Sequence, residues 1–162
     1  NSIDESVNQI RQIIYSLRDP QATVPVVQRL RRELTSAHGS LGFTPKFTLT
    51  NLGEVIVSGS HTEIDDELGS DLADDVVAVV RECLSNTARH AQATSVTIDI
   101  RIENHRIEII IVDNGQGVKP ELSRRSGLSN LAARARRHHG TFSLRPGDGS
   151  TGTKVIWTAI IN

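Results

Sequence analysis

The chain has 162 residues, enough for one domain with a single hydrophobic core, and 37% of them are hydrophobic. A formal net charge of −1 excludes the basic excess of a nucleic-acid-binding domain, so we expect no nucleic acid partner. The single cysteine, Cys83, excludes an internal disulfide and favours a reducing, cytoplasmic setting, and no apolar run is long enough to cross a membrane. Because the chain lacks Met and a helical pattern is already under way at its first residues, we expect it to be a piece of a longer protein.

Two helices are predicted in the first quarter of the chain. Asp4–Arg18 places apolar residues at helical spacing, and Asp19-Pro20 ends the pattern. This segment carries much aliphatic surface, so it either packs on this chain or, as we favour, ends a longer helical hairpin. A second helix is predicted from about Val24 to His38, with Gly39 ending it in a left-handed conformation.

The next stretch predicts less regular structure. Phe43–Leu52 alternates from Lys46 onward and is expected to form a strand. Gly53–Gly69 mixes short apolar pieces with Ser, Gly and acidic residues. It predicts a second short strand or a β-turn, followed by a polar loop.

The helix that organises the chain is predicted over Asp71–Ala91. One narrow apolar stripe contains Ala73, Val77, Val80, Leu84, Ala88 and Ala91. The opposite face carries Glu82, Asn86 and Arg89, with His90 beside them. A carboxylate and an amide suit Mg²⁺, and Arg and His donate to phosphate oxygens. By itself, this helix also fits an ordinary amphipathic helix with a polar exposed face.

A β-hairpin is predicted directly after this helix. Ser95–Glu103 and Arg106–Val112 alternate in hydrophobicity around the turn Asn104-His105. Asp113 continues the row that points into the core, and a buried ionised acid without a donor costs several kcal/mol or more. We therefore expect a hydrogen-bond donor beside Asp113. Gly115 and Gly117 follow and permit close approach of a flat ligand or a phosphate, although this pattern also occurs in plain turns.

The last part predicts one helix and two strands. Val118–Ser126 reads as a polar loop, and Gly127–His139 as a helix with Leu128 and Leu131 among its inward residues. His138-His139 fits a solvated helix end better than a metal site. Strands are expected over Thr141–Arg145 and Lys154–Ile161, with Trp157 in the core.

Four motifs follow one another in a linked order. They are Glu82-x-x-x-Asn86-x-x-Arg89-His90, Asp113-x-Gly115-x-Gly117, Gly127-Leu128-x-Asn130-Leu131 and Gly152-Thr153. This series resembles the ATP-binding domain of sensor histidine kinases, in the wider group of gyrase-type, Hsp90-type and MutL-type ATPases. The phrases RECLSNTARHA and GLSNLAARA look like the NarX/NreB-type kinases, which pair with LuxR-type response regulators. More narrowly, the chain looks like the mycobacterial haem-containing oxygen and redox sensor kinases of the dormancy response.

The resemblance implies an α+β fold. It is a two-layer α/β sandwich, the Bergerat ATP-binding fold, with a mixed sheet of about five strands packed on about three helices. Residues 1–20 would form the end of the second dimerisation helix and a linker. Residues 21–162 would form the ATP-binding catalytic domain.

The resemblance also implies ATP and Mg²⁺ as cofactors and a role for each site residue. At the phosphates, Asn86 would ligate Mg²⁺, Glu82 would act as general base or orient the attacking group, and Arg89 and His90 would contact phosphate oxygens. At the base, the site residues would be Asp113, which accepts from the adenine amino group, then Gly115, Gly117 and Thr153. Gly127 and Leu128 would form the far hinge of a lid.

Two features depart from the family pattern. Arg125 replaces a second glycine that related kinases carry, and the lid Val118–Ser126 has only nine residues. These departures predict weak nucleotide binding by the isolated domain. In addition, no His lies in the His-Asp-x-x-x-Gln context of a phosphoacceptor. We therefore expect this chain to bind ATP without labelling itself.

The expected partners follow from the same resemblance. They are the kinase's own dimerisation domain and, through the full-length protein, a LuxR-type response regulator. The full-length protein would be a homodimer and this chain a monomer. Two alternatives remain: an anti-sigma-factor-type serine kinase, which needs no dimerisation hairpin, and a nucleotide-binding module without turnover.

Overall fold

The computed structural model describes residues 24–56, 62–116, 128–147 and 152–162. The predicted helix Asp4–Arg18 and the predicted lid Val118–Ser126 lie outside these residues, as do Gly117 and Gly127. Across the ranges that are described, no helix has the length and apolar character needed to span a bilayer.

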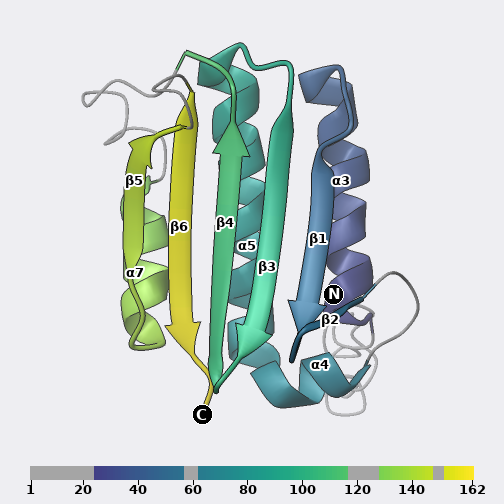
Figure 1. Ribbon diagram of the computed structural model, residues 1–162, viewed down its shortest axis with the longest axis vertical. Helices are drawn as coiled ribbons and strands as arrows, with labels where there is room; N and C mark the ends of the chain where they lie inside the picture. Colours follow the sequence, from purple (N-terminus) through teal and green to yellow (C-terminus); the bar gives the residue numbers. More distant parts are fainter. Residues whose placement is uncertain (1–23, 57–61, 117–127, 148–151) are drawn as a thin grey trace, which may run out of the picture.

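One mixed sheet organises the molecule (Figure 1). Its strand order is β2-β1-β3-β4-β6-β5, and only β1 and β3 pair in parallel. The strands are β1 (Lys46–Asn51), β2 (Glu54–Val55), β3 (Val96–Glu103), β4 (Arg106–Asp113), β5 (Phe142–Pro146) and β6 (Thr153–Ile160). The predicted α+β fold is confirmed, and the sheet has six strands because the two-residue β2 adds an edge.

The helices form the second layer, behind the sheet in Figure 1. They are α3 (Val26–Leu41), α4 (Thr62–Leu68), α5 (Ser70–Asn86) and α7 (Leu128–Arg137), and a π-helical turn, η1 (Thr87–Ala91), continues α5. The predicted alternation is confirmed, because every second residue of β3 and β4 is buried toward this layer. Trp157 is fully buried, and its Nε1 donates to the carbonyl of Leu131 in α7 at 3.0 Å. Burial raises the pKa of the Cys83 thiol to about 12, as is typical of a structural rather than a reactive cysteine.

Two local predictions are wrong. The polar loop predicted within Gly53–Gly69 contains the helix α4, because Ile64 and Leu68, one turn apart, are both buried in the core. The helix predicted to end at Gly39 runs on to Leu41. Gly42, with φ of +85°, takes the left-handed position that caps it.

Candidate functional site

The predicted site residues come from four segments that meet at one end of the sheet (Figure 1, top). α5 runs toward this end and continues into η1, and β4 ends there. β6 starts there because Asp113, the last residue of β4, pairs with Thr153, the first residue of β6. α7 also begins at this end. The fold therefore brings together motifs that lie far apart in the sequence.

The helical residues form a linked set. Asn86 Oδ1 accepts a hydrogen bond from Arg89 Nη2 at 3.0 Å, and the same Nη2 lies 4.0 Å from Glu82 Oε2. Asn86, predicted on the polar face opposite the apolar stripe, is only 6% exposed, which does not fit the alternative of an ordinary amphipathic helix with a polar exposed face at this position. Ala88, expected on the buried stripe, is half-buried. The buried face of α5 is wider than the predicted stripe, because Val79 and Cys83, seven and three residues before Asn86, are buried as well.

Thr87 connects the helix to the strand. Its hydroxyl donates to Asp113 Oδ2 at 3.4 Å, and both residues are buried. Its backbone N–H donates to the carbonyls of Cys83 and Leu84, four and three residues earlier in α5. The sequence reasoning missed Thr87. The signal that could have identified it is its position directly after Asn86, in a segment that was already expected to face a ligand.

Asp113 is held by neutral donors. Besides Thr87, the N–H of Gly115 donates to its Oδ1 at 2.9 Å. Burial raises the pKa of Asp113 above its ordinary value, and hydrogen bonds from Gly115, Thr87 and the backbone of Thr153 partly oppose that shift. The predicted need for a donor beside this carboxylate is therefore confirmed, although the chain itself supplies donors.

The segment after Asp113 is fixed by side-chain hydrogen bonds. Asn114 Oδ1 accepts from the N–H groups of Thr94 and Ser95 at 2.8 and 2.9 Å, and its Nδ2 donates to Thr94 Oγ1. Gln116 Nε2 donates to Gln92 Oε1 at 2.8 Å. These bonds tie the loop that contains Gly115 to the chain that leaves η1.

Gly152 and Thr153 lie directly beside Asp113. A Cβ on Gly152 would lie 2.0 Å from the carbonyl oxygen of Asp113, and φ there is +73°, so only glycine fits. Thr153 is buried, and its Oγ1 has no hydrogen-bond partner among the residues that the structure describes. The same holds for Asn86 Nδ2. Buried polar atoms of this kind cost about 1–3 kcal/mol unless a ligand or water satisfies them.

Two further predicted residues are only located on their elements. His90 lies in η1 and Leu128 opens α7, but their side chains are not among those described. The structure therefore brings Glu82, Asn86, Arg89, Asp113, Gly115 and Thr153 to the same end of the sheet. Of the other four predicted residues, Gly117 and Gly127 lie outside the described part of the chain.

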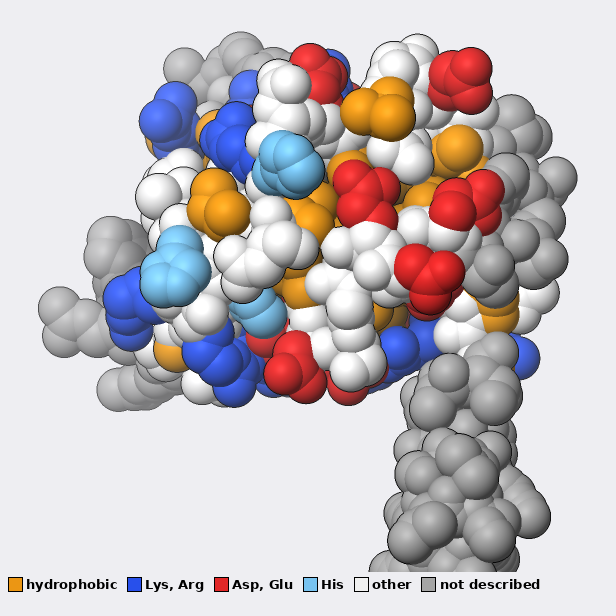
Figure 2. Space-filling model, turned by 90° about the horizontal axis from the view of Figure 1, so that it is seen from below, with side chains coloured by type: hydrophobic (Ala, Val, Ile, Leu, Met, Phe, Trp, Pro, Cys, Tyr) orange, Lys and Arg blue, Asp and Glu red, His pale blue; other side chains and the backbone are white. Residues whose placement is uncertain are grey.

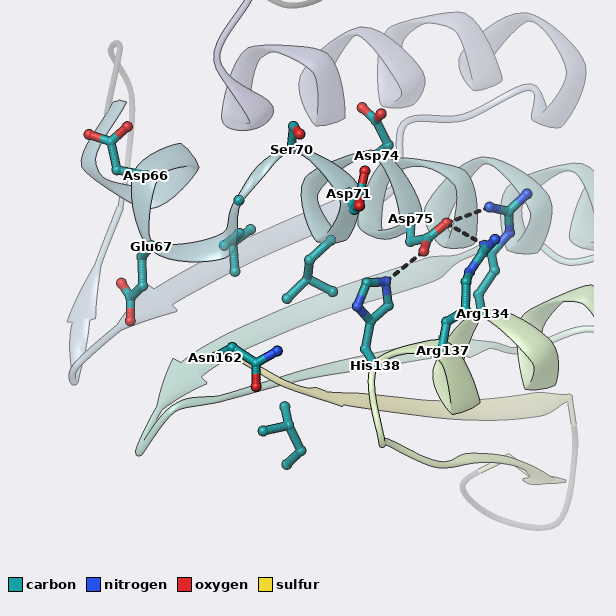
Figure 3. A pocket seen from close by; sticks show the side chains of 14 residues that line it. Asp66, Glu67, Ser70, Asp71, Asp74, Asp75, Arg134, Arg137, His138 and Asn162 are labelled. Carbon is teal, nitrogen blue, oxygen red and sulfur yellow. Dashed lines mark hydrogen bonds and ion pairs between the residues drawn. The ribbon is translucent and has the colours of Figure 1, made fainter.

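The opposite end of the molecule holds a charge cluster that the sequence did not predict (Figure 3). Asp75 of α5 is buried, and its Oδ1 accepts from Arg134 Nη1 at 2.6 Å and Arg137 Nη2 at 2.9 Å. His138 Nε2 lies 2.7 Å from its Oδ2. The expectation of a solvated helix end at His138 is therefore wrong, because the imidazole packs against this buried carboxylate.

This lower end contains a groove whose two sides carry side chains of opposite charge. Figure 2 shows acidic side chains gathered toward α4 and basic ones toward α7, around a groove of about 800 Å³. Asp66, Glu67 and Asp71 line the groove on one side, and Arg134 and Arg137 on the other. Neither Asn86 nor Asp113 lines it, so this groove is separate from the predicted site.

Comparison with known proteins gives one family. A family model described as histidine kinase-, DNA gyrase B-, and HSP90-like ATPase matches residues 71–160, more than half of the chain. The sensor histidine kinase LiaS of Bacillus subtilis is 30% identical over 93 residues, 56% of this chain and 26% of LiaS. The sensor protein VraS of Staphylococcus aureus is 28% identical over 131 residues, 79% of this chain and 38% of VraS. The chain thus spans between a quarter and two fifths of these two relatives.

Solved structures agree on the fold. The ATP-binding domain of PrrB from Mycobacterium tuberculosis superposes with a TM-score of 0.56 at 24% identity, covering 86% of this chain and 96% of that one. The histidine kinase AdeS of Acinetobacter baumannii gives a TM-score of 0.55 at 15% identity, covering 85% of this chain and 64% of AdeS.

Proposed function

Because the chain belongs to the histidine kinase-, DNA gyrase B- and HSP90-like ATPase family, we propose that Mg-ATP binds where η1, the end of β4 and the start of β6 meet. Within that family the chain corresponds to the ATP-binding catalytic domain of a two-component sensor histidine kinase.

One observation carries the proposal. Asn86 and Asp113 are buried polar residues on different elements, and Thr87 joins them by following the first in sequence and bonding to the second. Beside them, Asn86 Nδ2 and Thr153 Oγ1 have no partner in the described part of the chain. Since buried polar groups are nearly always satisfied, atoms left in this state beside a carboxylate support a ligand with donors and acceptors of its own.

At the phosphate end, the side chains suit a magnesium phosphate. Arg89 uses one lone pair of Asn86 Oδ1, and an amide oxygen has a second that would hold Mg²⁺. When bound, the cation offsets phosphate charge. Arg89 and His90 would donate to phosphate oxygens, and Glu82 would orient the attacking group.

At the base end, the chain offers an acceptor and space. Asp113 would accept from the adenine amino group, and Thr153 would line the same side. Gly115 and Gly117 would let the backbone pass close to the ring. Gly127 and Leu128 would serve as the far hinge of the lid.

Calorimetric titration of Mg-ATP into this chain tests the site. We expect saturable binding that is weaker than low micromolar because the lid is short. Asn86→Ala and Asp113→Asn should each reduce affinity at least about tenfold. Asp99→Asn, the same chemical change at a partly exposed position on β3, is the matched control and should leave affinity unchanged. Absence of binding, or equal effects of Asp99→Asn and Asp113→Asn, would contradict the proposed site.

For the whole protein, we propose transfer of the γ-phosphoryl group to a His on a dimerisation domain outside this chain. Residues 1–20 would end the second dimerisation helix, and residues 21–162 would form the catalytic domain. RECLSNTARHA and GLSNLAARA support a cytoplasmic, homodimeric NarX/NreB-type kinase that acts on a LuxR-type regulator. They also support kinship with the mycobacterial haem-based sensors. This chain alone would be a monomer.

The reaction is tested by incubating the chain with labelled ATP and a separately made dimerisation domain. A kinase of this type gives acid-labile phosphohistidine on the added domain. An anti-sigma-factor-type serine kinase gives no phosphohistidine there, and a module without turnover transfers no label to any partner. Either of these last two outcomes would contradict the proposed phosphotransfer.

A further inference from the structure

Thr87 makes a contact that none of the proposed roles requires. It opens η1, is buried, and directs its hydroxyl across to Asp113 Oδ2, 26 residues away in sequence. A helical threonine commonly turns its hydroxyl back to a carbonyl of the preceding turn. Here the hydroxyl donates to the strand carboxylate instead.

Together with Gly115, this contact fixes how the carboxylate is turned. The N–H of Gly115 donates to Oδ1 at 2.9 Å, and the hydroxyl of Thr87 makes a longer hydrogen bond to Oδ2, at 3.4 Å. With a donor on each oxygen, the carboxylate plane cannot rotate freely about its Cβ–Cγ bond. The lone pairs that remain therefore point in set directions.

We propose that Thr87 is a positioning residue that orients the Asp113 carboxylate toward the 6-amino group of adenine and so favours 6-aminopurine over 6-oxopurine nucleotides. This inference rests on the proposed ATP site. A carboxylate held in place accepts a hydrogen bond from an amino group, whereas a 6-oxo group would bring a second acceptor against it. Loss of the hydroxyl would release Oδ2 and weaken the discrimination.

The test compares Mg-ATP with Mg-ITP, which carries a carbonyl in place of the amino group. Thr87→Val keeps the shape of the side chain and removes the hydroxyl. We expect it to weaken Mg-ATP binding about tenfold and to change Mg-ITP binding less than about twofold. Thr87→Ser restores the donor and should return Mg-ATP affinity to within about threefold of the parent. Circular dichroism establishes that each variant is folded, and Thr87→Ala replaces the valine variant if that one does not fold.

Two comparisons separate positioning from a purely structural role. Thr158 of β6 is also a buried threonine, hydrogen-bonded to Thr141 directly before β5, and Thr158→Val should lower stability without changing the ATP-to-ITP ratio. In an Asp113→Asn background, Thr87→Val should cause no further loss of Mg-ATP affinity, because it acts through that carboxylate.

The outcomes are distinct. Equal losses for ATP and ITP, an unchanged ratio, or a further loss in the Asp113→Asn background would each overturn the role of Thr87 while leaving the ATP site standing. Failure of the parent chain to bind Mg-ATP would overturn both proposals.

Discussion

Each end of the sheet holds one buried aspartate, and the chain surrounds the two differently. At the lower end, Asp75 faces two guanidinium groups and an imidazole. At the upper end, Asp113 is held by the N–H of Gly115 and the hydroxyl of Thr87, and none of the described ion pairs includes it. The two residues are almost equally buried, at 5% and 6% exposure.

The difference in hydrogen-bond and charge partners distinguishes a carboxylate with a structural role, Asp75, from one that is available to a ligand, Asp113. The charge of Asp75 is balanced within the chain, and its partners join the first part of α5 to the last part of α7. The charge of Asp113 is not balanced in this way, so its ionised form is disfavoured by burial. A nucleotide with a hydrogen-bond donor would stabilise the buried carboxylate of Asp113. The carboxylate of Asp75 already has three partners within the chain.

Removal of Asp75 should have the largest effect on stability. Asp75→Ala leaves two guanidinium groups and an imidazole without the buried carboxylate that they share, and we expect the free energy of unfolding to fall by about 3 kcal/mol. Urea denaturation measures this. Asp74→Ala is the matched control, because Asp74 is exposed in its ion pair with Arg29 and should contribute less than about 1 kcal/mol. If Asp75→Ala lowered the free energy of unfolding no more than Asp74→Ala does, Asp75 would not have the structural role assigned to it here.

Two glycines, one at each end, allow the same comparison through the backbone. At Gly152, an added Cβ would lie 2.0 Å from the carbonyl oxygen of Asp113. At Gly140, an added Cβ would lie 1.8 Å from the carbonyl oxygen of Thr158. Alanine at either position should lower the free energy of unfolding by about 2 kcal/mol. Only Gly152→Ala displaces the backbone of Asp113, so only this variant should weaken Mg-ATP binding, by about tenfold. Gly39, which has nothing within 4 Å of its would-be Cβ, serves as the harmless glycine control.

Replacement of Asp113 should separate stability from binding. Burial raises the pKa of Asp113 above 3.8, so its ionised form destabilises the fold. The stability linked to this group is therefore greatest below that value and is lost as pH rises through the pKa of the folded state. At pH 7, Asp113→Asn should raise the melting temperature by about 2–4 °C while weakening Mg-ATP binding. The difference in melting temperature should shrink as the pH falls toward 3.8, and a constant difference would argue against burial as its cause.

The smallest effect concerns the two arginines that share Asp75 Oδ1. The Arg137 side chain is 60% exposed and that of Arg134 is 32% exposed. We expect Arg137→Ala to cost about 0.5 kcal/mol and Arg134→Ala about twice that, measured by urea denaturation with Asp74→Ala beside them. The opposite order would show that the more exposed guanidinium carries the cluster.

The upper end of the sheet could be predicted from the sequence because its signals are local. Alternation in β3 and β4 sets which side chains face the helices, and that parity alone places Asp113 in the interior. The burial of Asn86 was not predicted, because the apolar stripe of α5 was taken as narrow whereas Val79 and Cys83, on the side of the helix that carries Asn86, are buried too.

The lower end could not be predicted because its contacts are distant. Asp75 and His138 are 63 residues apart, and no periodicity links a carboxylate on one helix to an imidazole after another. The helix α4 was hidden for a different reason. Its acidic residues outnumber the two apolar residues that anchor it, so its composition favours a loop although Ile64 and Leu68 are spaced for a helix.

The indole of Trp157 gives the chain a spectroscopic reporter. It is the only tryptophan in the sequence, it is fully buried, and it donates its one hydrogen bond to α7. Movement of α7 away from the sheet would break that bond and admit water to the ring, which shifts indole emission to longer wavelength. Intrinsic fluorescence can therefore follow this helix in the unmodified protein, during nucleotide titration as well as during unfolding.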